Sequence, residues 1–156
     1  MNDNKYMLAA LEEAKIAAAR GEVPVGAVIV DPASGKIIAT SGNRTENDHD
    51  PTAHAEILAI RAACAEIQAP RLPDFDLYVT LEPCPMCAAA ISFARIRRLY
   101  FGAYDPKGGG VDHGARVFSH TTCHHAPEVF GGIHETDCAH VLKEFFAARR
   151  SDETIS

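Results

Sequence analysis

The stretch Leu77–Ala90, "LYVTLEPCPMCAAA", carries a strand, a proline-containing turn and the start of a helix. Its first five residues are apolar or β-branched, which indicates a buried strand, and Pro83 is a helix-start signal. Cys84 and Cys87 follow at positions i and i+3, so both thiols face the same side of the first helical turn. Two thiolates at the positive end of a helix dipole can bind one zinc ion. The pair alone does not decide this, because Cys-x-x-Cys also occurs in redox proteins and in zinc knuckles, which usually carry a second pair.

A second stretch, Pro51–Ile60 ("PTAHAEILAI"), offers a third zinc ligand at the start of another expected helix. In the middle of a helix, His54 and Glu56 would point about 200° apart. At a helix N-terminus side chains tilt toward that end, so both can reach a metal that lies just beyond it. His54, Cys84 and Cys87 therefore predict a zinc site with three protein ligands and one open position, which is typical of catalytic zinc. Glu56 is then an unbound carboxylate beside the open position and a candidate general base.

The rest of the chain alternates between helical and strand patterns. The expected helices are Asn4–Arg20, Ala53–Glu66, Pro85–Ala94 and Thr136–Arg149. The expected strands are Val25–Val30, Lys36–Thr40, Leu77–Leu81, Arg98–Gly102 and, more weakly, Glu128–Phe130. The Gly-rich segment Asp105–Phe118 has no assignable pattern. Helices that alternate with buried strands predict an α/β sandwich around a central sheet, and 156 residues fit one domain, residues 1–156.

The five cysteines argue against a disulfide framework, because their number is odd. Cys64 and Cys138 lie among alanines in helical patterns and are expected to be small buried hydrophobic residues. The run Cys123–His125, "CHH", would suggest a second metal site, but adjacent ligands without a partner cluster argue against one. Only Cys84 and Cys87 have the spacing of metal ligands.

The composition is that of an ordinary soluble globular protein, with 47% hydrophobic and 23% charged residues. The N-terminal residues lack the pattern of a signal peptide, and no apolar run is long enough to cross a bilayer, so a cytoplasmic location is expected. The formal net charge of −6 disfavours nonspecific nucleic-acid binding and, taken alone, suggests a small-molecule partner.

The two metal-binding stretches together resemble a known signature. His-Ala-Glu, followed about thirty residues later by Pro-Cys-x-x-Cys, is similar to the motif pair of the zinc-dependent cytidine and adenosine deaminase superfamily. More closely, the chain resembles the bacterial tRNA-specific adenosine deaminases, which convert the wobble adenosine of a tRNA to inosine. The similarity runs from about Tyr6 to Arg150. It is carried by "EVPVGAVIV" (Glu22–Val30), "GNR" (Gly42–Arg44), "HDPTAHAEI" (His49–Ile57), "LYVTLEPCPMCAAA" (Leu77–Ala90), "RIRRLYFGAYDPKGG" (Arg95–Gly109) and "FFAARR" (Phe145–Arg150).

This resemblance implies a zinc-dependent hydrolase with one Zn²⁺ per subunit, bound by His54, Cys84 and Cys87, and with Glu56 as the proton shuttle. It implies a cytidine deaminase-like fold, which is a three-layer α/β/α sandwich with a mixed five-stranded central sheet. It also implies a cytoplasmic homodimer whose interface helps to form the RNA site. The expected partner is the anticodon stem-loop of a tRNA, and no membrane association is expected.

The resemblance further implies a set of substrate-binding residues. Asn43 matches an asparagine that hydrogen-bonds the flipped nucleotide, and Asp105 and Lys107 match a loop that contacts the neighbouring nucleotides. The remaining members are the pocket-lining Ala55 and Leu81 and, on a C-terminal helix that meets the RNA, Phe146, Arg149 and Arg150. Turn residues and helix-end arginines also explain several of these positions without a ligand. A local basic patch of Arg95, Arg97, Arg98, Lys107, Arg149 and Arg150 would reconcile RNA binding with the acidic net charge.

Two other functions compete with this interpretation. The first is a deaminase of a free base or nucleoside, such as guanine or cytidine, which would use the same zinc site. The loop "DPKGG" (Asp105–Gly109) and the C-terminal "FFAARR" argue against it, because a small-molecule pocket has no obvious use for them. The second is a zinc-stabilised binding module without catalysis. Glu56 argues against that module, because a structural zinc site prefers a fourth protein ligand to an unbound carboxylate.

Overall fold

A mixed five-stranded sheet forms the centre of the protein in the computed structural model, which describes residues 3–155 and the side chains of residues 5–151. The strands are β1 (Gly26–Asp31), β2 (Lys36–Gly42), β3 (Asp76–Leu81), β4 (Arg98–Ala103) and β5 (Glu128–Phe130), in the order β2-β1-β3-β4-β5. β1 is antiparallel to both β2 and β3, whereas β3, β4 and β5 are mutually parallel. The central strands are almost continuously buried, as expected for strands with both faces covered.

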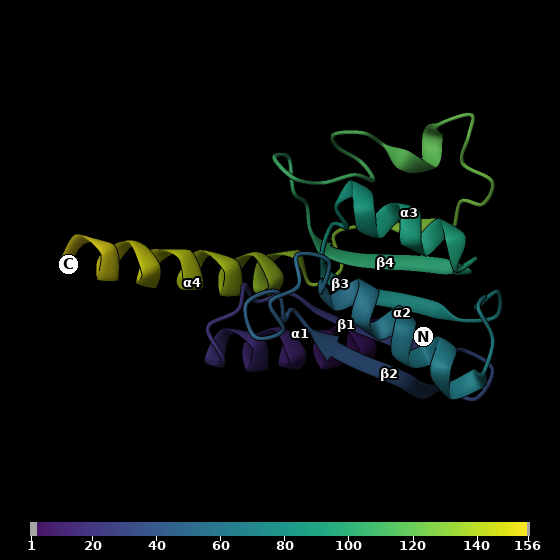
Figure 1. The fold of residues 1–156 in the computed structure, drawn as a ribbon, viewed down its shortest axis with the longest axis horizontal. Coiled ribbons are helices and arrows are strands. Elements are labelled where there is room, and N and C mark those ends of the chain that lie inside the picture. Colours follow the sequence, from purple (N-terminus) through teal and green to yellow (C-terminus); the bar gives the residue numbers. More distant parts are fainter. Residues whose placement is uncertain (1–2, 156) are drawn as a thin grey trace.

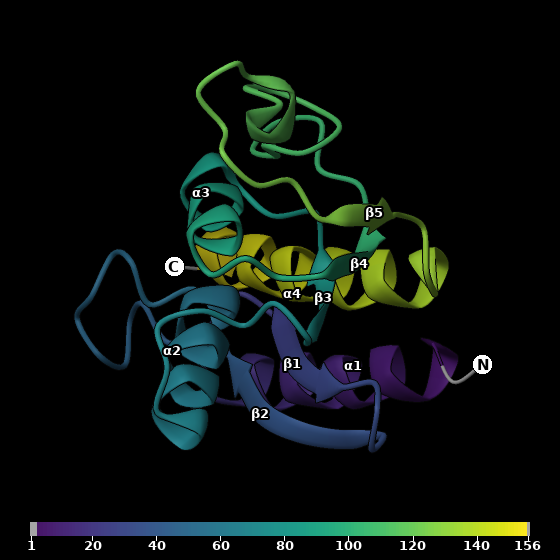
Figure 2. The ribbon, with the colours of Figure 1, turned by 90° about the vertical axis from the view of Figure 1, so that its right-hand side faces the viewer.

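Helices cover both faces of this sheet. Two of them, α1 (Asp3–Ala19) and α4 (Glu135–Ile155), pack on one face. The other face carries α2 (Ala55–Ile67) and α3 (Pro85–Phe93), which lie side by side, with the short 3-10 helix η1 (Val117–Ser119) packed on α3 (Figure 2). The predicted three-layer α/β/α sandwich with a mixed five-stranded sheet is therefore confirmed.

The alternation of side chains along each strand divides the apolar residues into two cores. Val28, Val30, Tyr78 and Tyr100 point toward α1 and α4. Their neighbours in sequence point the other way and build the second core, under α2 and α3, from Ala27, Ile29, Leu77, Val79, Leu99 and Phe101. Both cores are closely packed. A Cβ atom at Gly102 would lie 2.7 Å from the Thr80 carbonyl oxygen and 2.8 Å from Cys138 Cβ, so glycine lets α4 approach β4.

The last helix is longer than the sequence pattern predicts. The expected helix ended at Arg149, whereas α4 continues to Ile155. Residues 150–155 are mostly polar and show no apolar periodicity, so the pattern gave no sign of a further turn. Figure 1 shows that this end of α4 extends well beyond the sheet, so it needs no apolar face toward the sheet.

The topology also determines where a site can form. Because β3 and β4 are parallel, their carboxyl ends lie at the same edge of the sheet. The segments that follow them, Glu82–Cys84 and Tyr104–Lys107, therefore meet beyond that edge. α2 and α3 both begin there, and open α/β sheets bind ligands at this kind of edge.

Candidate active site

Three side chains with the chemistry of zinc ligands meet where α2 and α3 begin. His54 is the N-cap residue of α2 and Cys84 is the N-cap residue of α3, both with extended backbone conformations. Cys87 lies in the first turn of α3 and is fully buried. The Nδ1 atom of His54 is 3.6 Å from the Cys84 sulfur and 3.4 Å from the Cys87 sulfur. The two helix starts thus bring the three ligand atoms within 4.8 Å of one another.

This geometry fits a zinc ion. With Zn–S bonds of about 2.3 Å and Zn–N bonds of about 2.0 Å, tetrahedral coordination separates sulfur from nitrogen by roughly 3.5 Å. The two observed sulfur–nitrogen distances, 3.4 and 3.6 Å, bracket that value. Among the residues that the structure describes, no other group of three potential ligands is this compact, and Cys123–His125 does not form one. Three protein ligands leave one coordination position open, as in catalytic zinc sites.

The cysteine pair is already polarised toward metal binding. The hydrogen bond from the Cys87 thiol, followed by the contact with His54, lowers the pKa of Cys84 to about 4. The pKa of Cys87 is raised, because its thiol donates that hydrogen bond and is buried. The lowered pKa of Cys84 favours its thiolate form, and zinc would displace the proton of Cys87, because only thiolates bind the metal.

Glu56 is the carboxylate nearest to this group. It lies in the first turn of α2 and is only 4% exposed. Burial raises the pKa of Glu56 to about 7, and the negative charge on Cys84 adds to that effect. A carboxyl group with a pKa near neutrality can both accept and donate a proton at physiological pH.

A cleft of about 330 Å³ opens above these residues. Val23 and Val25, between α1 and β1, form apolar lining, and Thr45 lies in the loop that follows β2. The remaining lining residues are Asn43, His54, Glu56, Leu81, Glu82, Cys84, Asp105 and Gly108. Five of the lining residues were not predicted from the sequence, namely Val23, Val25, Thr45, Glu82 and Gly108. The only signal for them was that four of the five lie inside the stretches that carry the resemblance.

The loop that carries Asn43 and Thr45 is held by a buried carboxylate. Glu22 is 1% exposed and accepts hydrogen bonds from the backbone amides of Glu46 and Asn47, at 3.2 and 2.7 Å. Asn43 itself is 8% exposed, and its side-chain amide has no hydrogen-bond partner in the described part of the chain. A fixed, unpaired amide in the cleft wall is available to a ligand.

The predicted substrate residues fall into two groups. Asn43, Leu81 and Asp105 line the cleft. One Asp105 carboxylate oxygen is engaged in its own turn, because Oδ1 accepts hydrogen bonds from the amides of Lys107 and Gly108, at 3.2 and 2.9 Å. The turn interpretation of Asp105 thus holds for this oxygen.

The second group lies outside the cleft lining. Ala55 is fully buried at the start of α2, and Lys107 is exposed on the loop after β4. Phe146, Arg149 and Arg150 are exposed on α4. The Arg149 guanidinium lies 4.7 Å from the centre of the Phe145 ring and donates a 2.8 Å hydrogen bond to the Gly21 carbonyl oxygen.

The expected basic patch is wrong for Arg97 and Arg98. Arg97 makes a two-pronged ion pair with Asp76, at 2.8 and 2.7 Å, and Arg98 pairs with Glu128 at 3.1 Å. These residues lie at the start of β4, whereas the cleft lies beyond its end at Ala103. Their charges therefore balance local carboxylates instead of facing the cleft.

No helix in residues 3–155 is both long enough and apolar enough to span a membrane.

Comparison with known proteins gives consistent matches. The family described as the cytidine and deoxycytidylate deaminase zinc-binding region matches residues 1–103. A tRNA-specific adenosine deaminase of Agrobacterium fabrum is 59% identical over 148 residues, which cover 95% of this chain and 96% of that protein. A tRNA-specific adenosine deaminase of Bacillus subtilis is 43% identical over 148 residues, which cover 95% and 91%.

Solved structures give the same result. A structure from a study of A-to-I editing by tRNA:A34 deaminases at the wobble position of transfer RNA superposes with a TM-score of 0.86. It is 60% identical and covers 88% of this chain and 99% of its own. A guanine deaminase from Nitrosomonas europaea has a TM-score of 0.81 at 23% identity, covering 92% and 84% of the two chains, which shows a shared fold.

Proposed function

Because the chain belongs to the cytidine and deoxycytidylate deaminase zinc-binding family, and within it to the tRNA-specific adenosine deaminases, we propose that it hydrolyses the wobble adenosine of a tRNA to inosine. The observation that carries the chemistry is the buried Glu56 beside three zinc-type ligands in an open cleft. A purely structural zinc site would have no use for that carboxylate. The reaction consumes one water molecule and releases one ammonia molecule.

His54, Cys84 and Cys87 would hold the zinc ion. When bound, zinc supplies Lewis acidity that makes a water molecule a better nucleophile at neutral pH. Glu56 accepts a proton from the attacking water and delivers it to N1 of the adenine. Glu56 then accepts the remaining proton of the water oxygen now bonded to C6 and delivers it to the amine, so that the C6–N bond breaks, ammonia leaves and C6 becomes the carbonyl carbon of inosine. A pKa raised to about 7 suits one group to both roles.

The cleft and its surroundings support a single extruded nucleotide as the substrate. A volume of about 330 Å³ matches a pocket for a small ligand, and an adenine inside a base stack would not reach Glu56. Bases of an anticodon loop unstack at low cost. Asn43 would hydrogen-bond the extruded nucleotide through its unpaired amide. Asp105 and Lys107, on the loop at the cleft mouth, would contact its neighbours.

The remaining predicted substrate residues lie in or beside the cleft, as Leu81 and Ala55 do, or on α4. Ala55 supports the pocket from the start of α2, where its backbone lies beside His54, and Leu81 lines the cleft. Phe146, Arg149 and Arg150 would meet the RNA along α4, since all three are exposed there.

The protein would act in the cytoplasm as a homodimer with one zinc ion per subunit. Phe93 supports an interface between copies, because it is 74% exposed at the end of α3 and borders a mostly apolar cavity of about 340 Å³. Light scattering on the eluting protein would give its mass, and metal analysis of the same fraction would give zinc per chain. A monomer at micromolar concentration would contradict the dimer.

The substrate is tested with zinc-loaded protein and a synthetic anticodon stem-loop that carries adenosine at the wobble position. Free adenosine, guanine and cytidine are offered in parallel, and products are identified by mass spectrometry. A stem-loop with the adenosine moved one position along the loop is the matched control. We expect inosine in the first stem-loop alone. Conversion of free guanine or cytidine with the RNA unchanged would replace this proposal with a small-molecule deaminase.

A further inference from the structure

A second buried carboxylate in the cleft wall has no part in the chemistry proposed above. Glu82 is 2% exposed and lies between Leu81, the last residue of β3, and the segment that leads to Cys84. Glu82 Oε1 accepts hydrogen bonds from the Asp105 amide at 3.0 Å and from the His113 ring at 2.8 Å. Glu82 Oε2 accepts three more, from the consecutive amides of Val111, Asp112 and His113, at 3.2, 3.0 and 3.0 Å. Five donors thus converge on one side chain.

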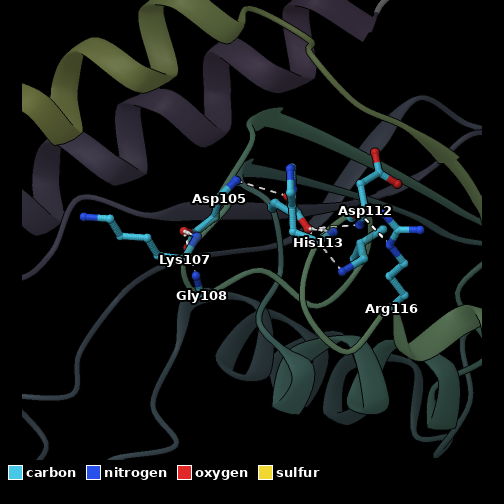
Figure 3. A network of polar contacts seen from close by, with 8 residues as sticks. Asp105, Lys107, Gly108, Asp112, His113 and Arg116 are labelled. Atoms are coloured by element: carbon cyan, nitrogen blue, oxygen red, sulfur yellow. Dashed lines mark hydrogen bonds and ion pairs between the residues drawn. The ribbon is translucent and has the colours of Figure 1, made fainter.

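These bonds hold both ends of one loop, residues 105–113. Figure 3 shows the backbone of Asp112 and His113 turned toward the same point, while the Lys107 side chain extends away from it. Within the loop, the amide of Gly109 donates to the Asp105 carbonyl oxygen at 2.9 Å. The amide of Gly110 donates to the Pro83 carbonyl oxygen at 2.7 Å. The loop is therefore bound at several points to the segment that carries Cys84.

The glycines of this loop allow the close approach. A Cβ atom at Gly109 would overlap the Glu82 Oε2 atom, and one at Gly110 would lie 2.5 Å from the Pro85 nitrogen. Four backbone amides and the His113 ring face the Glu82 carboxylate, and a carboxylate acceptor makes hydrogen bonds stronger than those between neutral groups.

We propose that Glu82 is a positioning residue that fixes the loop 105–113 at the cleft mouth and thereby places Asp105 and Lys107 against the RNA. This inference rests on the proposed tRNA substrate and assigns a role to a residue outside the chemistry. Glu82 does not touch Glu56 or the zinc ligands through any hydrogen bond in the described part of the chain. Its loss should therefore weaken RNA binding and leave the chemical step intact.

The first test is Glu82→Gln, assayed with zinc-loaded protein and the wobble-adenosine stem-loop. A glutamine amide presents one acceptor oxygen and one NH₂ group, so at least two of the five donors lose their partner. We expect KM to rise about tenfold, while kcat stays within about twofold and zinc content is unchanged, which is the pattern of lost uniform binding. Glu66→Gln is the matched control, because it makes the same change at an exposed site on α2 and should leave KM unchanged.

Limited trypsin digestion tests whether the loop 105–113 is held in place, without an activity assay. Lys107 is exposed, and the Lys107–Gly108 bond lies inside the loop. We expect cleavage at this bond to be about tenfold faster in Glu82→Gln than in the wild type, with the cut identified by mass spectrometry.

Two further variants test the same role if Glu82→Gln fails to fold. Gly109→Ala displaces the carboxylate by the overlap described above, and His113→Asn removes the ring donor alone. Both should raise KM at least threefold.

The outcomes separate the two proposals. Wild-type KM and wild-type trypsin resistance in folded, zinc-loaded Glu82→Gln would overturn the positioning role, as would wild-type KM in both Gly109→Ala and His113→Asn. A lower melting temperature with unchanged KM would assign Glu82 to stability alone and also overturn it. Failure of the wild type to deaminate the stem-loop would instead refute the proposed function. The trypsin comparison would still report whether Glu82 fixes the loop.

Discussion

Residue by residue, the cleft shows how environment assigns different roles to one chemical group. Glu56 and Glu82 are both almost fully buried carboxylates that line the same space. Burial dominates for Glu56 and raises its pKa to about 7. For Glu82, backbone and histidine donors outweigh burial and lower the pKa. Glu56 can therefore exchange protons at neutral pH, whereas Glu82 stays an anion that holds a loop.

Replacing Glu56 should separate metal binding from turnover. In Glu56→Gln we expect zinc content to match the wild type, because the three ligands are intact. Inosine formation on the stem-loop should fall about 10²–10⁴-fold, the usual contribution of a general acid and base. Single-turnover kinetics with metal analysis would check both. Activity within about threefold of the wild type would remove Glu56 from the reaction.

The cysteines should differ sharply in reactivity once zinc is stripped. A thiol with a pKa lowered to about 4 is fully ionised at pH 6, which is the state of Cys84. Burial raises the pKa of Cys138 to about 12 and also raises that of Cys64, so both stay protonated at this pH. Iodoacetamide should therefore label Cys84 first, and restored zinc should suppress the reaction. Peptide mass spectrometry would identify the labelled cysteines. Equal labelling of Cys64 and Cys84 would refute the lowered pKa of Cys84.

Single elements contribute to the site through their ends. α2 and α3 begin at the candidate zinc ligands His54 and Cys84, so the positive ends of two helix dipoles face the cysteine sulfurs. α4 is different, because its C-terminal part leaves the sheet and exposes Phe146, Arg149 and Arg150 (Figure 1). An aromatic ring and two cations on an exposed helix face form a surface that suits RNA better than a small molecule.

Removing the exposed ring on α4 should affect RNA affinity and not stability. Phe146 is 42% exposed and makes an edge contact with Phe145. The Phe146→Ala variant therefore buries only slightly less apolar surface than the wild type. Stacking of a base on an aromatic ring is worth about 1–3 kcal/mol, which predicts a rise in KM of at least about fivefold. Leu8→Ala, at a position 46% exposed on α1, is the control. A melting temperature that falls while KM stays constant would make Phe146 a packing residue.

At the scale of the whole molecule, charge is the unusual property for an RNA-binding protein. The formal net charge is −6, and Arg97 and Arg98 are used in ion pairs at the far end of β4. The exposed positive side chains on the expected RNA side are few, chiefly Lys107, Arg149 and Arg150. The electrostatic part of binding should therefore be modest, and most of the specificity should come from the cleft itself.

Salt dependence would measure this directly. If three cations meet phosphates, the log of the binding constant for the stem-loop should fall against log salt with a slope of about −2, since each contact with single-stranded RNA contributes about −0.7. Lys107→Ala should make the slope shallower by about 0.7. Arg98→Ala, whose partner is the exposed Glu128, should not change it. A wild-type slope near zero would contradict RNA binding through these residues.

Local patterns in the chain predicted the secondary structure and the candidate zinc ligands His54, Cys84 and Cys87, whose ligand atoms the structure brings together. Apolar strand runs, helix-start signals and the spacing of Cys84 and Cys87 are properties of a few consecutive residues. The structure shows the helices and strands close to where they were expected. The family resemblance is confirmed as well, at 59% identity over 95% of the chain. The roles of Glu56, Asn43 and the RNA-contacting residues stay predictions, since geometry places them without testing what they do.

Other features depended on residues far apart in the chain, and no local pattern could reveal them. Glu82 and His113 are separated by 31 positions, Glu22 and Asn47 by 25, and Arg97 and Asp76 by 21. Each of these contacts forms only after the strands pair and the helices pack, because packing alone determines which charged group meets which donor. The two motifs of the candidate metal site could thus be predicted from short-range spacing. The meeting of His54 with the two cysteines, the walls of the cleft, the fixed loop and the ion pairs of Arg97 and Arg98 required the folded chain.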